Sequence, residues 1–130
     1  MDTVFDTADT VPGTVRIGGA FRPNGSSAFS NSTSTNTLYG IATIARNSAG
    51  NFTVTLPFGA ASIRSIRLGY RLSALPANVA SIMVIGAPTV STSAISFVIQ
   101  YAENNVAADI ASNAANWIDW EITVDNGTLP

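Results

Sequence analysis

The segment WIDWEITV, residues 117–124, alternates polar-face and apolar-face side chains over its whole length. Successive side chains of a β-strand point to opposite faces, so a period of two predicts a strand with one buried and one solvated face. Ile118, Trp120, Ile122 and Val124 fall on one face, and Trp117 falls on the other. We therefore expect one tryptophan in the core and the other, Trp117, outside.

The same alternation recurs along the chain. It is clearest in residues 51–56 (NFTVTL), 64–72 (RSIRLGYRL) and 94–101 (AISFVIQY), with shorter strand candidates at 14–20, 38–46 and 81–85. Seven or eight short strands at roughly even spacing predict an all-β fold. We expect a single antiparallel, jelly-roll-like β-sandwich with long loops rich in Ser, Thr and Asn.

The connections between these segments also carry signals. Residues 47–50 suit a hairpin turn, and longer connections are expected around Pro76 and Pro88. Segment 104–117 contains many alanines, but asparagine favours caps and turns. We expect at most one or two helical turns there, within a long loop.

A length of 130 residues predicts one domain. We divide it into an N-terminal arm (1–14), a β-sandwich body (15–126) and a C-terminal tail (127–130). The arm either orders against a neighbour or is a frayed terminus. Within the body, residues 26–37 are almost all Ser, Thr and Asn, which predicts a solvent-facing loop that hydrates the surface without adding charge.

The composition excludes several kinds of chemistry. The chain has no Cys and no His, and all six of its basic residues are arginine. A Ser–His or Cys–His nucleophile pair, an imidazole metal site and a Schiff-base lysine are therefore all missing. We expect no enzyme, no cofactor and no metal.

Charge is sparse as well. Charged residues make up 11% of the chain and the net charge is −2, whereas about a quarter of residues are charged in ordinary soluble domains. This predicts no binding to nucleic acid or to an anionic membrane. No signal peptide or membrane-spanning helix is expected either. Low charge also suits a protein packed beside many copies of itself.

The arginines are the most informative charged set. Arg64, Arg67 and Arg71 lie within eight residues, and Arg67 and Arg71 should project from one face of a strand. Because the guanidinium fork binds carboxylates bidentately, arginine is favoured in interface ion pairs. We hypothesise that this face meets a neighbouring subunit; the alternative is that these arginines only keep the surface soluble.

Two further groups have alternative interpretations. Trp117 and Tyr39 offer flat aromatic surfaces, which suit either a subunit contact or a sugar ring. Asp119 and Glu121 share one strand face, and a pair of carboxylates is what glycoside hydrolysis requires. Alternating acids on the wet side of a strand are usually solvated, and we adopt that interpretation here.

Three segments carry a resemblance to a known group: GGAFRPNGSS (18–27), GNFTVTLPF (50–58) and AADIASNAANWIDWEITV (107–124). Together they resemble small virion proteins of tailed bacteriophages, the head decoration or cement proteins and related spike modules. The likeness spans residues 15–126. The arm adds nothing to it.

The resemblance implies a compact β-sandwich, usually a homotrimer, located on the outer capsid surface. Its partners would be copies of itself and the major capsid protein. Phe21 and Arg22, in the first segment, join the arginines and Trp117 as candidate interface residues. The alternative function is a receptor-binding or carbohydrate-binding module of a tail fibre or head spike, and a hydrolase using paired carboxylates is a third class.

Overall fold

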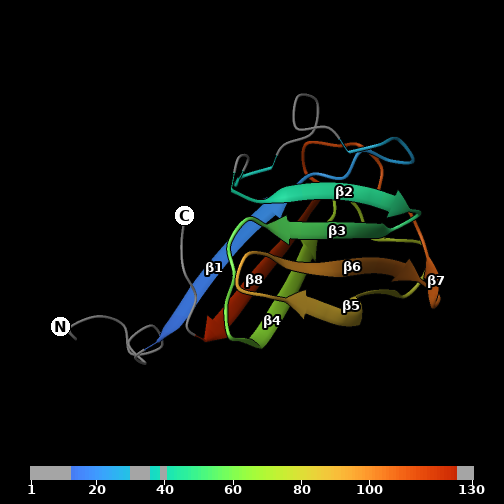
Figure 1. Cartoon of the computed structure of the whole chain (residues 1–130). Helices are drawn as coiled ribbons and strands as arrows, with labels where there is room; N and C mark the ends of the chain where they lie inside the picture. Colours follow the sequence, from blue (N-terminus) through green and yellow to red (C-terminus); the bar gives the residue numbers. More distant parts are fainter. Residues whose placement is uncertain (1–12, 30–35, 39–40, 126–130) are drawn as a thin grey trace, which may run out of the picture.

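The computed structural model describes residues 13–29, 36–38 and 41–125, and in that part the chain forms eight β-strands and no helix (Figure 1). The strands are β1 (Thr14–Phe21), β2 (Thr43–Ser48), β3 (Asn51–Leu56), β4 (Ser62–Arg71), β5 (Ala80–Val90), β6 (Ile95–Glu103), β7 (Val106–Ala107) and β8 (Trp117–Asp125). Most of the expected arm, the middle of the Ser/Thr/Asn loop, Tyr39 and the C-terminal tail lie outside the described residues.

The strands form two antiparallel sheets. The smaller sheet has the order β1-β8-β4, and the five-stranded sheet has the order β2-β3-β6-β5, with β7 paired to the end of β6. In Figure 1 the strands of the two sheets cross at a steep angle, with β2, β3, β6 and β5 lying across β1, β8 and β4. The predicted all-β sandwich is confirmed.

The core lies between the two sheets, where the apolar face of each central strand is buried. On β8 these residues are Ile118, Trp120, Ile122 and Val124, and on β6 they are Ile95, Phe97, Ile99 and Tyr101. Three aromatic pairs connect the sheets: Phe21 with Phe52, Tyr70 with Tyr101, and Phe97 with Trp120, at centroid distances of 5.0, 5.6 and 5.8 Å. Such pairs add to the energy of area burial.

Two tight turns set the register of neighbouring strands. Gly50, in the β2–β3 turn, has a φ of 69°, and a β-carbon there would clash with the carbonyl oxygens of Tyr101 and Ala108. Asn104 and Asn105 join β6 to β7 with φ values of 51° and 63°. Two consecutive positive φ values are typical of a type I′ hairpin turn. The alanine-rich segment therefore opens as a hairpin and continues as a loop.

Strand β5 is longer than the sequence indicates. Residues 81–85 were expected as strand and the stretch around Pro88 as a connection, but β5 continues to Val90. Its pairing with β6 is interrupted between Ile85 and Thr89, where Gly86 has a φ of 72°. Proline cannot donate a ladder hydrogen bond, and such residues are tolerated at edges and bulges. An edge strand with an irregularity thus replaces the predicted connection.

Candidate interaction surface

The outer side of the three-stranded sheet is where most of the candidate residues lie. Arg67 pairs across to Glu121, and Arg71 pairs across to Trp117. The inward residues of the same strands, including Leu68 and Trp120, pack against the core. We call the outward side of β1, β8 and β4 the charged face. As expected from the alternation, Arg67 and Arg71 both project from it.

Glu121 lies at the centre of this charged face. On one side it is opposite Arg67 in the β4–β8 register. On the other side the Arg16 Nε atom is 3.9 Å from its Oε2 atom. Exposed ion pairs of this kind contribute only about 0–1 kcal/mol each. The two flanking arginines place positive charge on both sides of the Glu121 carboxylate.

Arg64 is held differently from the other two arginines. It lies at a register shift between Ile63 and Ser65, so the strict alternation of β4 is broken there. Its Nε atom donates to Asp125 Oδ1 at 2.9 Å, while Ser62 Oγ donates to Asp125 Oδ2 at 2.9 Å. Arg64 is therefore committed to a contact within its own sheet.

Trp117 is partly exposed and has two partners on the surface. The Arg71 guanidinium carbon lies 5.7 Å from the centroid of its ring, a cation–π distance. Its Nε1 atom donates to the carbonyl oxygen of Ala114 at 3.1 Å. These contacts hold the indole against the end of the charged face, next to the β4 terminus.

Phe21 and Arg22 occupy different environments. Phe21 is fully buried and packs on Phe29 and Phe52. A fully buried side chain presents no surface to a partner, so its role is to anchor the following loop rather than to contact a neighbour. Arg22 is partly exposed directly after β1 and precedes the buried Pro23. The candidate interface is thus reduced to Arg22, Arg64, Arg67, Arg71 and Trp117.

The paired acids lie in a shallow groove of the charged face. Asp119 and Glu121 line this open hollow of about 450 Å³ together with Gly18, Ala20 and Arg67. A β-carbon at Gly69 would clash with the Asp119 carboxylate, so this small residue lets the acid lie flat on the sheet. The acids are accessible, as the sequence predicts for solvated positions.

The outer side of the five-stranded sheet differs sharply from the charged face. Two charged residues on its strands, Arg46 and Glu103, lie on the core side of the sheet. Arg46 is the register partner of buried Phe52, and Glu103 accepts a hydrogen bond from buried Tyr101. The outward positions carry no ionisable group in the part of the chain that the structure describes. They are Thr43, Ala45, Asn47, Asn51, Thr53, Thr55, Ser81, Met83, Ile85, Ser96, Val98 and Gln100, and we call this the uncharged face.

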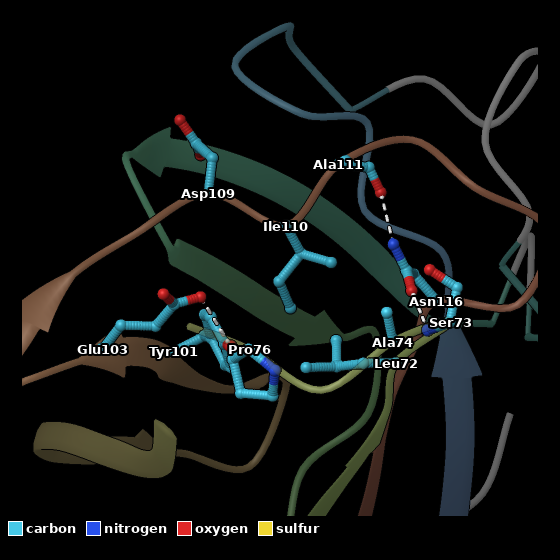
Figure 2. A pocket seen from close by; sticks show the side chains of 10 residues that line it. All are labelled: Leu72, Ser73, Ala74, Pro76, Tyr101, Glu103, Asp109, Ile110, Ala111 and Asn116. Atoms are coloured by element: carbon cyan, nitrogen blue, oxygen red, sulfur yellow. Dashed lines mark hydrogen bonds between the residues drawn. The ribbon is translucent and has the colours of Figure 1, made fainter. Parts of the chain in front are cut away.

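A pocket of about 250 Å³ opens at one end of the sandwich. Figure 2 shows Asn116 at its wall, where the amide accepts from the Ser73 backbone (2.6 Å) and donates to the Ala111 carbonyl (2.9 Å). Tyr101 donates to Glu103 across the floor at 2.9 Å. Burial, together with this bond, raises the pKa of Tyr101 to about 12. The phenol therefore stays protonated at neutral pH.

Asp109 lines the same pocket and is held by a bidentate ion pair. Arg46 donates to its two carboxylate oxygens at 3.1 and 2.9 Å, and the Gly50 amide donates at 3.2 Å. The arginine bonds in particular hold the pKa of Asp109 below its usual value. This cluster joins the β2–β3 turn to the loop after β7, which are far apart in the sequence.

Exposed apolar side chains gather beside this pocket. Leu75, Val79 and Val106 are 95%, 79% and 67% exposed. They lie on the loop before β5 and on the β6–β7 hairpin, which meet where Asn104 N donates to Val79 O at 2.9 Å. We call these three residues the apolar tip. Loop tips this apolar are typical of contact surfaces.

Residues 13–29, 36–38 and 41–125 contain neither a metal-ligand cluster nor a membrane-spanning helix. No group of three or more potential metal ligands occurs among them. These same residues form no helix of the length and hydropathy needed to cross a bilayer.

Comparison with protein-family models, with curated proteins and with solved structures finds no match to this chain.

Sequence reasoning missed both the uncharged face and the apolar tip. The uncharged face had a signal: the polar positions of residues 51–56 and 94–101 are Asn, Thr, Ser and Gln, whereas those of residues 64–72 and 117–124 carry the charges. The sequence signal for the apolar tip was weaker. Leu75 and Val79 lie in a connection without periodicity, so no pattern indicates which of its side chains are exposed.

Proposed function

We propose that the chain is a non-enzymatic structural protein of a tailed-phage virion. It is a decoration (cement) protein that binds the outer capsid surface as a homotrimer and stabilises the shell. The observation that carries this proposal is the apolar tip, because three large side chains exposed at one end of a small sandwich favour burial against a partner. The three resembling sequence segments supply the class of partner.

The tip and the charged face form one continuous docking surface in this proposal. Arg71 is the last residue of β4 and leads directly into the loop that carries Leu75. Trp117 and Arg71 would then border the apolar contact, giving it an apolar centre and a polar rim. The neighbouring subunit expected at the arginines is, in this arrangement, the major capsid protein.

The mechanism is mechanical. Each copy of the trimer attaches at its own site, so the second and third attachments are effectively intramolecular. Such linkage raises the overall affinity by about 10²–10⁴-fold without any new kind of contact. Many trimers bound across junctions of the shell would oppose its expansion together.

Co-sedimentation with capsids that lack the protein tests this function. We expect the wild-type chain to bind them, Leu75→Asp to bind far more weakly, and the Arg67→Glu, Arg71→Glu double variant to lose affinity while staying folded. Thr92→Asp is the matched control, because it adds the same charge at an exposed position in the β5–β6 turn, at the opposite end of β6 from the tip. Wild-type protein that stays in the supernatant would contradict the proposal.

A receptor-binding or carbohydrate-binding module of a tail fibre or head spike is the second candidate. The pocket of Figure 2 favours it, because its 250 Å³ suits a ligand of about the size of one sugar and it combines carboxylates with apolar walls. Selective binding on a glycan array, together with failure to bind capsids, would replace the first proposal by this one.

A further inference from the structure

The two outer surfaces of the sandwich differ in charge, and this difference assigns them different partners. Seven charged residues lie on β1, β4 and β8: Arg16, Arg64, Arg67, Arg71, Asp119, Glu121 and Asp125. The outward side of β2, β3, β6 and β5 has none within the described ranges. Burying a charge without a partner is costly, whereas burying hydroxyl and amide groups requires only that they find hydrogen bonds.

The centre of the uncharged face is apolar. Ile85 pairs directly with Val98, and Met83, two residues along β5, is 45% exposed. Around them lie small polar side chains, some already bonded to one another: Asn47 donates to Thr53 at 2.7 Å. An apolar centre with a polar and uncharged rim is the composition of a protein–protein contact.

The size of the face is adequate for a specific contact. Four strands about 4.8 Å apart and six to eleven residues long, at about 3.3 Å per residue, give a footprint on the order of 500 Å². A standard interface takes roughly 800 Å² from each partner. The face is therefore of the right order for the total area that one copy buries against its neighbours.

Contact through the face fits better than strand addition at the edge. β5 ends the sheet order, but its irregularity at Gly86 and the missing N–H of Pro88 interrupt the row of backbone donors. Edges interrupted in this way resist pairing with another strand. β2, the other edge strand of this sheet, is only six residues long, and short edge strands also resist pairing. The side chains of the sheet, rather than its edges, are left to make the contact.

We propose that the uncharged face is the surface through which copies of this chain bind one another. This inference deepens the proposed function, because it rests on the expected homotrimer and names the surface that forms it. An identical uncharged face is the complementary partner, since a charged surface brought against it would lose hydration and gain no opposite charge across the contact. Three copies about one axis each place part of the face against both neighbours, and the charged face and apolar tip stay available for the shell.

The test is the mass of the full chain in solution, measured by light scattering on a sizing column. We expect about three times the 13.5 kDa chain mass for the wild type. Val98→Lys places a charge at the centre of the face and should raise the dissociation constant about 10²–10³-fold, giving a single-chain mass. Met83→Lys, on the exposed edge strand, should do the same with less risk to folding.

Thr123→Lys is the matched control. Thr123 is an outward residue of β8, the central strand of the other sheet, and the variant should keep the wild-type mass. Circular dichroism must show that all variants are folded. A wild-type mass of one chain, an oligomer that persists in both face variants, or equal dissociation of the control would overturn the inference.

The outcome is separable from that of the proposed function. A single-chain protein that still binds capsids would remove the self-contact and leave the function, and if Val98→Lys then lost capsid binding, the face would belong to the shell contact. An oligomer disrupted by Val98→Lys that ignores capsids would leave the self-contact and remove the function.

Discussion

The two tryptophans of the chain give a direct test of the sandwich, because they lie three residues apart on one strand and face opposite sides. Trp120 is buried and packs edge-on to Phe97 at 5.8 Å. Replacing a buried tryptophan by alanine costs about 3–5 kcal/mol of unfolding free energy. Trp117 instead contacts Arg71 and donates one surface hydrogen bond. Losing both contacts costs about 1–2 kcal/mol.

These costs convert into well-separated melting temperatures. An unfolding entropy of about 2.1 cal/mol/K per residue predicts that Trp120→Ala melts roughly 11–18 °C below the wild type, and Trp117→Ala roughly 4–7 °C below it. All samples should be melted at one chain concentration and followed by circular dichroism, because the stability of an oligomer depends on concentration.

Tryptophan fluorescence tests the same placement of Trp120 inside and Trp117 outside without relying on stability. Trp117→Phe leaves Trp120 as the sole tryptophan, and its emission should lie to the blue, as in an apolar core. Trp120→Phe leaves Trp117, whose emission should lie to the red. Equal melting temperatures for the two alanine variants, or the reverse order of emission, would refute the placement of β8 between the core and the charged face.

Three further predictions concern single sites. Gly50→Ala should lower the unfolding free energy by at least about 2 kcal/mol in a denaturant titration, because both the positive φ and the close backbone neighbours of Gly50 exclude a β-carbon. Gly86 has a similar φ but open space around it, so Gly86→Ala should cost only about 1 kcal/mol. Equal losses in the two variants would contradict the close approach of the backbone to Gly50. Asp109→Asn should lower the free energy of unfolding at pH 7. Because the folded-state pKa of Asp109 is lowered, the difference in unfolding free energy between the variant and the wild type should vanish as the pH falls below about 4. A difference independent of pH would exclude the ion pair with Arg46 as the cause. In an ultraviolet titration of the phenols, Tyr101 should ionise near pH 12, at a higher pH than an ordinary tyrosine. The stability gained from the neutral phenol should persist below about pH 10 and be lost as the pH rises through 12. Tyr101→Phe should remove this late ionisation step, and a step that survives in the variant would belong to another residue.

The alternation of apolar and polar residues in the sequence could predict where individual strands lie. Residues 51–56 and 117–124 became β3 and β8 with almost the expected bounds, because one fully apolar face leaves no alternative register. The stretch 86–90 was misread as a connection. Glycine and proline normally end a strand, but here they form an irregularity within an edge strand, whose free side needs no proline N–H.

Contacts between distant segments were beyond local patterns. Arg46 and Asp109 are 63 positions apart, and nothing in either neighbourhood indicates a bidentate pair. Counting every second residue from Ile66 and Leu68 places Arg64 on the inward face of the strand. A register shift beside Arg64 instead directs its side chain to Asp125. The candidate face was predictable at Arg67 and Arg71 because no irregularity intervenes between them.

We propose that this chain decorates the outside of a phage capsid, and the density of intact virions tests that proposal most directly. The account predicts repeated sandwich-sized density on the outer shell surface, with the loop carrying Leu75 turned toward the capsid protein. Density for the chain confined to the tail or to a single spike, with none on the shell, would contradict it.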